Sequence, residues 1–211
     1  KDKPFQVLKN AIDSQNFIAD VDTRNEIRKE LGLEDKFVVG HVGRLHPQKN
    51  HDFLIDVFAE LKKKKPNAEL ILVGTGPLEE KVKSKVAEKG FSGCVHFLGN
   101  RKDMNRIYQA MDVFVFPSLF EGLGIVAIEA QAAGVPIVCS EGLPPETDIT
   151  PIYRKLLLSD GEEMWANAAL EMAQNPSAHT NTQKYVIDAG FDMDATAKYM
   201  ESYYLNRWSR R

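Results

Sequence analysis

The amino-acid sequence predicts a doubly wound α/β fold built on a Rossmann-like parallel sheet. Short apolar runs of strand length alternate with longer amphipathic stretches along the 211 residues. This alternation is typical of parallel strands joined by right-handed helical crossovers. The strand runs are apolar at consecutive positions, which indicates burial on both faces of the sheet. We expect this domain to cover residues 23–160, with the sheet beginning near residue 36.

Four apolar runs predict strands, and a fifth run is a weaker candidate. The four are residues 37–39, 70–73, 113–116 and 137–138, and the weaker one is 96–98. Helices are expected between them over residues 51–64, from Pro77 onward, over 102–111 and over 124–133. The first of these helices carries an apolar stripe and ends at Pro66, and Pro77 fits the first position of the next helix.

The segments on either side of this domain have a different character. Residues 1–22 hold a short strand-like run, 5–8, followed by polar turn residues, and we interpret them as an interdomain linker with a first strand. Residues 161–211 are helical in pattern and are interrupted at Asn175-Pro176 and at Gly190. We expect these C-terminal helices to pack on the sheet and to reach toward a second domain.

Composition excludes several classes of function. Lys plus Arg number 27 and Asp plus Glu number 30, and the resulting net charge of −3 does not favour a nucleic-acid partner. Two cysteines are too few for a disulfide framework, and the five histidines lack a metal-binding spacing, so neither a metal nor another cofactor is expected. We interpret the two cysteines as reduced thiols of a cytoplasmic protein, and no apolar stretch reaches the roughly 20 residues of a membrane span. The first residue is Lys1 rather than Met, so we expect a fragment of a longer protein.

The residues that follow the first strand are candidates for a binding site, because open α/β sheets bind ligands at the carboxyl ends of their strands. Gly43 and Arg44 come there, and Lys49 follows. A glycine lets the backbone approach a ligand closely, and the two cations can bind phosphate oxygens. The alternative is an ordinary surface loop with two solvated cations, and this segment alone favours neither interpretation.

Two further loops are less specific. Gly74-Thr75-Gly76 supplies two glycines of a dinucleotide-binding fingerprint, but Glu79 occupies the position of the third, so a tight strand-to-helix turn is the better interpretation. The polar loop 99–103 could frame a nucleobase through its backbone groups, or it could be an ordinary loop before a helix.

The most informative segment follows the strand at 113–116. Glu121 precedes a Gly-x-Gly turn and a helix rich in small residues. Small residues let this helix lie close to the sheet, and its free N-terminal amides form an anion site. Glu129 lies on the same apolar helix, about 7 Å from its start at ~1.5 Å per residue. An unpaired buried carboxylate is costly, so we expect ligand hydroxyls or a cation beside Glu129, with solvent or a structural arginine as the alternative.

Five segments in this order resemble the carboxyl-terminal, donor-binding domain of retaining glycosyltransferases of the GT-B fold, family four. They are Val42–Leu45 with Lys49-Asn50, Val73–Pro77, Val95–Gly99, Pro117–Gly124, and Glu129-Ala130 through Gly134–Pro136. Asn10–Asp13 is similar to the interdomain linker of that family. After Ser140 the chain departs from the common pattern, and residues 141–158 are similar to bacterial capsule and exopolysaccharide transferases.

The resemblance implies a site for a nucleotide-diphosphate sugar. Arg44 and Lys49, with Gly43 beside them, would bind the diphosphate, and Glu121 would contact sugar hydroxyls. Arg44, Lys49 and Glu121 are therefore the implied catalytic residues. The distal phosphate and the sugar would be bound by four backbone amides, those of Gly122, Leu123, Gly124 and Ile125.

The nucleoside part of the donor is assigned by the same resemblance. Glu129 would bind the ribose hydroxyls, and the backbone near Asn100 and Arg101, with Met104, would frame the base. The implied reaction proceeds with retention and is assisted by the departing diphosphate, with no enzyme nucleophile. Stabilisation of that diphosphate by cations and helix amides would then be the main contribution of this half.

The implied partners are a nucleotide-sugar donor, an acceptor and a further domain. A UDP-sugar is favoured over a GDP-sugar, and the acceptor is a polysaccharide or a lipid-linked glycan. The N-terminal domain of the family would hold that acceptor, so we expect this chain alone to bind the donor without transferring sugar. The full-length protein could also lie peripherally at the inner membrane face. An epimerase-like enzyme or a non-catalytic nucleotide-binding module is the alternative.

Overall fold

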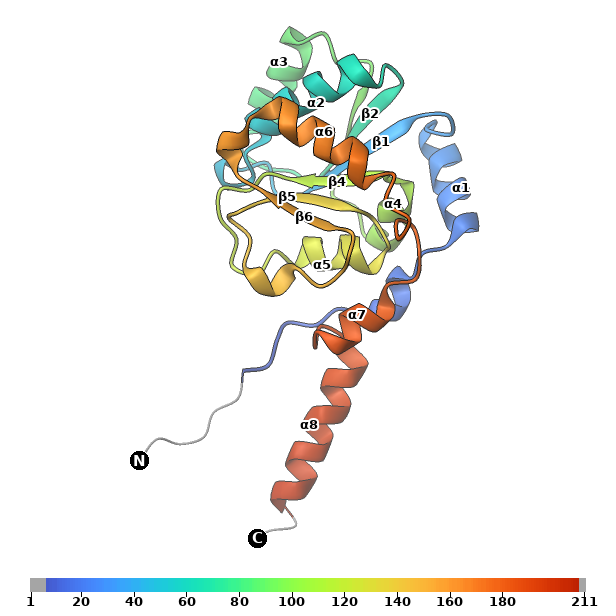
Figure 1. The fold of residues 1–211 in the computed structure, drawn as a ribbon, viewed down its shortest axis with the longest axis vertical. Coiled ribbons are helices and arrows are strands. Elements are labelled where there is room, and N and C mark those ends of the chain that lie inside the picture. The colour runs from blue at the N-terminus through green and yellow to red at the C-terminus, as the bar shows by residue number, and fades with distance from the viewer. Residues whose placement is uncertain (1–6, 209–211) are drawn as a thin grey trace.

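The computed structural model describes residues 7–208, with side chains to residue 206, and consists of a parallel sheet covered by helices on both faces (Figure 1). Every neighbouring pair of strands is parallel, and the strand order is β3-β2-β1-β4-β5-β6. The strands are β1 Phe37–Val42, β2 Ala68–Val73, β3 Val95–Gly99, β4 Val113–Phe116, β5 Ile137–Ser140 and β6 Tyr153–Leu156. The predicted doubly wound fold is confirmed, including the weaker strand candidate, which is β3.

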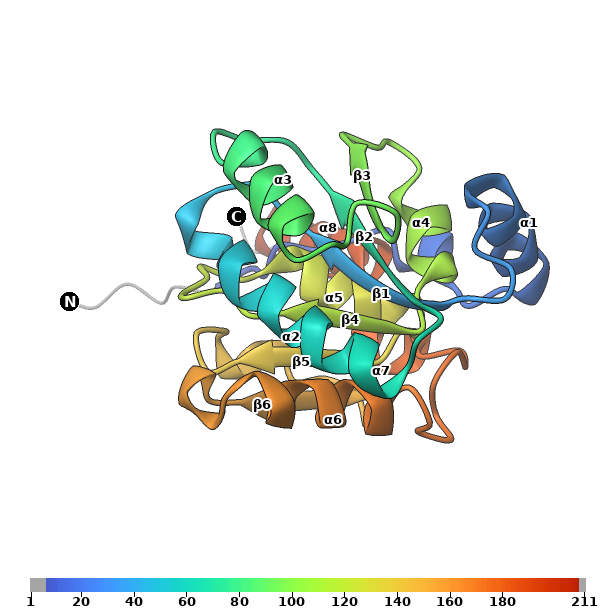
Figure 2. The same ribbon diagram turned by 90° about the horizontal axis from the view of Figure 1, so that it is seen from above.

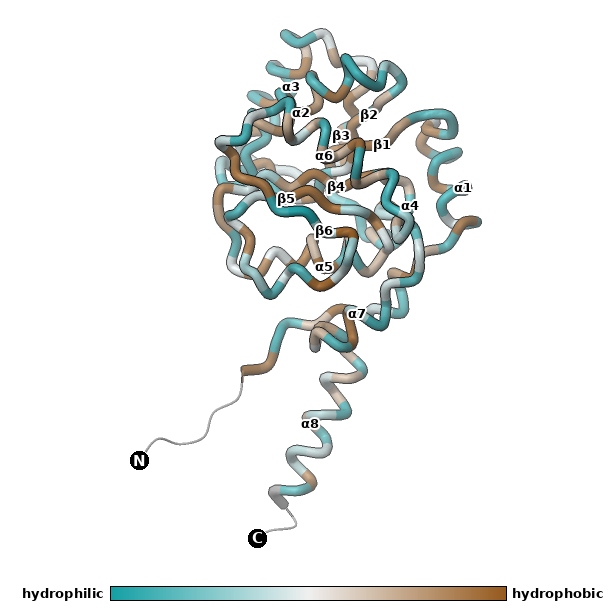
Figure 3. The backbone as a smooth tube through the Cα atoms, in the orientation of Figure 1, coloured by the Kyte–Doolittle hydropathy of each residue, from teal (hydrophilic) through white to brown (hydrophobic). Residues whose placement is uncertain are grey.

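Helices pack against both faces of the sheet (Figure 2). The first core lies under α2 His51–Lys64, α3 Glu79–Glu88 and α6 Glu162–Met172. The second core lies under α1 Val21–Leu31, α4 Met104–Ala110 and α5 Ile125–Ala132. Figure 3 shows hydrophobic residues concentrated along the central strands, as expected for strands that are covered on both sides.

Two elements were missed by the sequence pattern. Helix α1 begins after Asp20, whose side chain accepts a hydrogen bond from the Thr23 amide at 2.6 Å. Its apolar residues are too few to produce a clear stripe. Strand β6 reads Tyr153-Arg-Lys-Leu and lies at the edge of the sheet, where a polar strand is tolerated.

The predicted position of Pro77 at the start of a helix is wrong, because α3 begins at Glu79. The turn before α3 instead contacts the loop after β1. A Cβ atom on Gly76 would lie 2.4 Å from the Leu45 carbonyl oxygen, and the Leu78 amide donates to that oxygen at 3.0 Å. Pro77 therefore lies in a turn that is fixed by the neighbouring loop after β1.

The N-terminal segment runs beside the C-terminal helices rather than forming a strand. Of the strand-like run 5–8, residues 5 and 6 lie outside the described residues, and Val7 and Leu8 form no strand. Ile12 forms an isolated parallel bridge with Asp192, and the Ser14 hydroxyl donates to the Asp192 carboxylate at 2.5 Å. Helices α7 Gln183–Asp188 and α8 Met193–Trp208 follow α6, with breaks at the predicted places. Figure 1 shows α8 extending away from the sheet.

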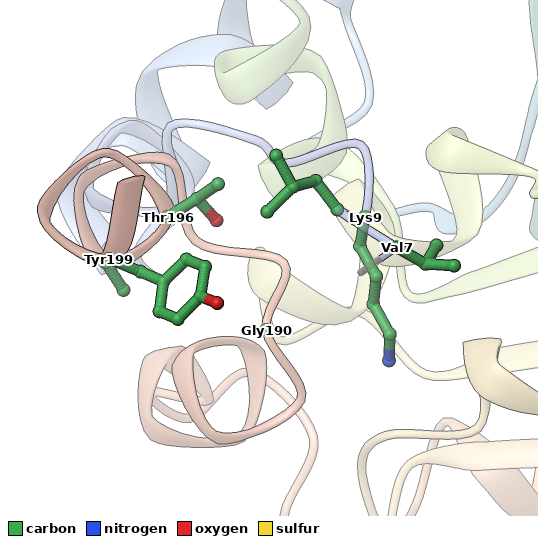
Figure 4. A pocket seen from close by; sticks show the side chains of 7 residues that line it. Val7, Lys9, Gly190, Thr196 and Tyr199 are labelled. Carbon is green, nitrogen blue, oxygen red and sulfur yellow. The ribbon is translucent and has the colours of Figure 1, made fainter. Parts of the chain in front are cut away.

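A shallow pocket lies between this N-terminal segment and the start of α8 (Figure 4). Val7, Lys9, Gly190, Thr196 and Tyr199 are among its lining residues. None of the strand-end loops contributes to it. This pocket is therefore separate from the residues that the sequence predicts to bind a ligand.

Candidate functional site

The strand order reverses between β1 and β4, and the loops that leave these two strands meet at that point. Sequential neighbours β1, β2 and β3 extend to one side, and β4, β5 and β6 extend to the other. A crevice outside the carboxyl ends of the strands is the expected ligand site at such a switch point. Both segments with predicted site residues, 43–49 and 121–125, leave the sheet here.

Glycines allow the loop after β1 to pack closely against its neighbours. The Gly43 amide donates to the Val73 carbonyl at 2.9 Å, and a Cβ on Gly74 would lie 2.2 Å from the Gly43 oxygen. A Cβ on Gly43 would lie 3.0 Å from Cε of Lys49, so the lysine side chain folds back across the glycine. Lys49 ends a short 3-10 helix, Pro47–Lys49. The predicted residues Gly43 and Lys49 are thus brought together.

Gln48 connects the loop after β1 to the loop after β4 through hydrogen bonds. Its carbonyl accepts from the Leu119 amide at 2.8 Å, and its side-chain amide donates to the Phe120 carbonyl at 2.8 Å. The Glu121 amide in turn donates to the Gly142 carbonyl at 2.9 Å. The sequence pattern did not identify Gln48, because an isolated glutamine in a loop carries no positional signal.

Lys49 and Glu121 form an ion pair between the loops that follow β1 and β4. The Lys49 ammonium lies 2.6 Å from Oε1 of Glu121, and the two side chains are only 14% and 7% exposed. The ammonium also lies 4.7 Å from the centre of the Phe116 ring. Two residues that were assigned separately to the diphosphate and to sugar hydroxyls therefore contact each other directly.

Arg44 is the unpaired cation of the site. It is exposed and forms no ion pair with any residue whose side chain the structure describes. The rings of His41 and His51 pack edge to face, with 4.8 Å between their centres, and add no positive charge at neutral pH. Burial lowers the pKa of both, and that of His51 falls to about 4. Arg44, Lys49 and Glu121 together carry one net positive charge.

The start of α5, which follows the carboxyl end of β4, has free backbone amides. Gly124 caps the helix with a φ of 71°, a left-handed conformation that favours glycine. Within the described residues, no acceptor is found for the amides from Gly122 to Val126. The helix dipole places partial positive charge at these groups. The side chains of Leu123 and Ile125 are partly buried and pack against a small apolar cluster that includes Ile128 of α5.

Glu129 lies one turn further along α5 and contacts a buried tyrosine. The Tyr108 hydroxyl donates to Oε2 of Glu129 at 2.9 Å. Burial raises the pKa of Glu129, and the Tyr108 hydrogen bond opposes that rise. No cation pairs with Glu129 among the residues described. The neighbouring cation and the structural arginine that the sequence suggested as partners are therefore not found there. The sequence pattern did not identify Tyr108, because a lone tyrosine in a helical segment carries no signal of a partner on another helix.

The loop that was predicted to frame a base lies beside the loop after β2. The Gly74 amide donates to the Gly99 carbonyl at 2.8 Å, and the Thr75 hydroxyl donates to the Asn100 side chain at 3.4 Å. The Arg101 guanidinium is paired with Asp103 at 2.6 Å and with Glu30 of α1 at 3.3 Å. These two carboxylates hold the Nε and one terminal nitrogen of Arg101 away from a role as a free cation.

Met104, the first residue of α4, is half-buried against the second core. No cluster of three or more potential metal ligands occurs in the part of the chain that the structure describes. Within that part, no helix is both long and apolar enough to cross a membrane.

Comparison with known proteins shows the family of this chain. Residues 23–190 match the family described as glycosyl transferases group 1. The chain belongs to this glycosyltransferase family. It is 33% identical over 169 residues to the putative glycosyltransferase EpsF of Bacillus subtilis, covering 79% of this chain and 44% of EpsF. It is 35% identical over 146 residues to the lipopolysaccharide core biosynthesis mannosyltransferase LpsB of Rhizobium meliloti, covering 66% and 41%.

Solved structures of glycosyltransferases have the same fold. HepE of Anabaena, in complex with UDP and glucose, superposes with a TM-score of 0.78 at 23% identity, over 94% of this chain and 56% of HepE. Sucrose-phosphate synthase of Thermosynechococcus elongatus gives a TM-score of 0.79 at 26% identity, over 98% and 53%. The chain thus spans about half the length of the relatives that it matches.

Proposed function

We propose that this chain is the donor-binding half of a retaining glycosyltransferase that uses a nucleotide-diphosphate sugar. The donor is a UDP-sugar in preference to a GDP-sugar, and the acceptor is a polysaccharide or a lipid-linked glycan. The observation that supports this most strongly is the meeting of Arg44, the Lys49–Glu121 pair and the free amides of α5 at the switch point of the sheet.

The cations and amides suit a diphosphate. Arg44 offers a planar set of donors without a competing carboxylate, and a guanidinium of this kind binds phosphate in bidentate fashion. The amides from Gly122 to Val126 lie at a helix N-terminus, where a second phosphate is favoured. Lys49 already has a carboxylate partner, so it would share its charge between Glu121 and the ligand.

The two glutamates suit the sugars at the ends of the donor. Glu121 precedes the amides in the loop, and Glu129 follows them on the helix, so an extended ligand could place one sugar at each. Carboxylates accept hydrogen bonds from vicinal hydroxyls. We assign the transferred sugar to Glu121 and the ribose to Glu129.

The chemistry in this proposal is electrostatic. As the bond between the sugar and the diphosphate breaks, negative charge grows on the leaving phosphate. Arg44, Lys49 and the amides of α5 are positioned before the reaction to stabilise that charge. We assign no nucleophile to this half of the enzyme. The acceptor would bind to a further domain, and this chain alone would bind the donor without transferring sugar. The name of LpsB places that protein in lipopolysaccharide core biosynthesis, which supports a role in polysaccharide assembly, and we propose that the enzyme acts in the cytoplasm.

Thermal unfolding with UDP, GDP and ADP tests the proposal. A ligand at about 100 times its Kd adds roughly 2.7 kcal/mol of stability, and UDP should give the largest rise in Tm. Arg44→Ala with Lys49→Ala should abolish this rise. As a matched control, Arg154→Ala with Lys63→Ala removes two cations that are paired on the surface and should preserve it. An undiminished rise in the Arg44 and Lys49 variant would contradict the assignment.

A further inference from the structure

The Tyr108 hydroxyl is fixed by the core and points at Glu129. We propose that Tyr108 is a positioning residue that orients the Glu129 carboxylate toward the ribose hydroxyls and so makes the site selective for ribonucleotides over deoxyribonucleotides. This inference rests on the proposed donor site. It adds to that proposal a residue that contacts no part of the ligand and acts through Glu129.

Packing determines where the hydroxyl lies. Tyr108 is completely buried in α4, and its ring lies 6.0 Å from the Phe17 ring and 6.1 Å from the Phe114 ring between centres. The hydroxyl approaches two acceptors on α5, the Glu129 carboxylate at 2.9 Å and the Val126 carbonyl at 3.2 Å. One proton serves both, and the shorter contact is to the charged acceptor. The tyrosine hydroxyl therefore links the buried face of α4 to the first turns of α5.

The carboxylate retains unused hydrogen-bonding capacity. Tyr108 contacts Oε2, and within residues 7–206 no other side chain donates to Glu129. A carboxylate has two oxygens and about four acceptor positions. Because Glu129 is only half-buried, Oε1 can accept from a ligand at the surface of the helix. A pair of neighbouring hydroxyls would then replace the water that the anion gives up.

The tyrosine also favours the form of Glu129 that accepts hydrogen bonds. Burial raises the pKa of Glu129, whereas the hydrogen bond from Tyr108 lowers it. Loss of the hydroxyl would leave burial unopposed, and a protonated acid has less capacity to accept from ribose. Removing the hydroxyl should therefore weaken ribose binding in two ways, because the carboxylate loses both its fixed orientation and part of its negative charge.

Calorimetric titration of the chain with UDP and with 2′,3′-dideoxy-UDP tests this inference. The ratio of the two Kd values reports the contribution of the ribose hydroxyls alone. In the unmodified chain we expect UDP to bind about tenfold more tightly, the scale of one hydrogen bond to a charged group. Tyr108→Phe keeps the ring and removes the hydroxyl, and it should reduce this ratio by about threefold or more.

Two further variants separate positioning from a general structural effect. Tyr153→Phe removes a hydroxyl that contacts Thr147 at 2.9 Å, away from Glu129, and should leave the ratio unchanged. In a Glu129→Gln background, Tyr108→Phe should change the ratio no further. A purely structural role would weaken both nucleotides equally in Tyr108→Phe, and an unchanged ratio would overturn the inference. Failure of UDP to bind the unmodified chain would instead refute the proposed function.

Discussion

Breaking the Lys49–Glu121 pair should destabilise the chain even without a ligand. At the observed 2.6 Å, the attraction of two unit charges at an effective dielectric constant of 20 is about 6 kcal/mol. Desolvation of both groups offsets most of that value, because the side chains are 14% and 7% exposed. Removing the lysine leaves an enclosed carboxylate without its partner. We therefore expect Lys49→Met to lower the free energy of unfolding by about 2–4 kcal/mol.

A double-mutant cycle by urea denaturation measures the interaction itself. Lys49→Met and Glu121→Gln should each cost stability, and the combined variant should cost less than their sum, with a coupling energy of about 1.5–3 kcal/mol. Lys184 and Asp188 provide a matched control on the surface, because their side chains are 84% and 60% exposed. Their coupling should stay below about 0.5 kcal/mol. Additive losses for Lys49 and Glu121 would refute the view that the two act as one unit.

Two further changes test the site and its surroundings. Gly124→Ala places a side chain at a φ of 71° and should cost about 1–2 kcal/mol of stability, and it should also weaken UDP binding. Gly32→Ala, at a φ of 68° with open space around it, should cost a similar amount and leave UDP binding unchanged; equal affinities in the two variants would contradict this assignment. Stability should fall as the pH drops from 6.5 toward about 4, because the unfolded chain takes up protons that buried His51, with a pKa lowered from 6.5 to about 4, does not. Urea midpoints across this range should fall less steeply for His51→Gln, and an identical slope would show that His51 is not responsible.

The sequence predicted the sheet well because its central strands are covered on both faces. β2 and β4 are buried along their whole length, so their residues form apolar runs that local pattern detects. β6, at the edge, has half-exposed polar residues and gives no such run. The same limit applies to α1, whose charged residues outnumber its core residues.

The residues of the candidate site could be proposed from the sequence, but their contacts with one another could not. Arg44, Lys49, Glu121 and Glu129 were found from the strands and helices that they follow or lie on. The Lys49–Glu121 pair joins residues 72 positions apart and depends on how a lysine folds over Gly43. The Tyr108–Glu129 contact depends equally on the packing of α4 against α5. Such contacts follow from three-dimensional packing, which local sequence patterns do not encode.

A crystal structure of this chain with UDP would test the central claim most directly. We predict that the diphosphate lies between the loops after β1 and β4, with one phosphate within hydrogen-bonding distance of Arg44 and the other at the amides from Gly122 to Val126. A nucleotide bound elsewhere, such as in the pocket between the N-terminal segment and α8, with both of these loops unoccupied, would contradict the account.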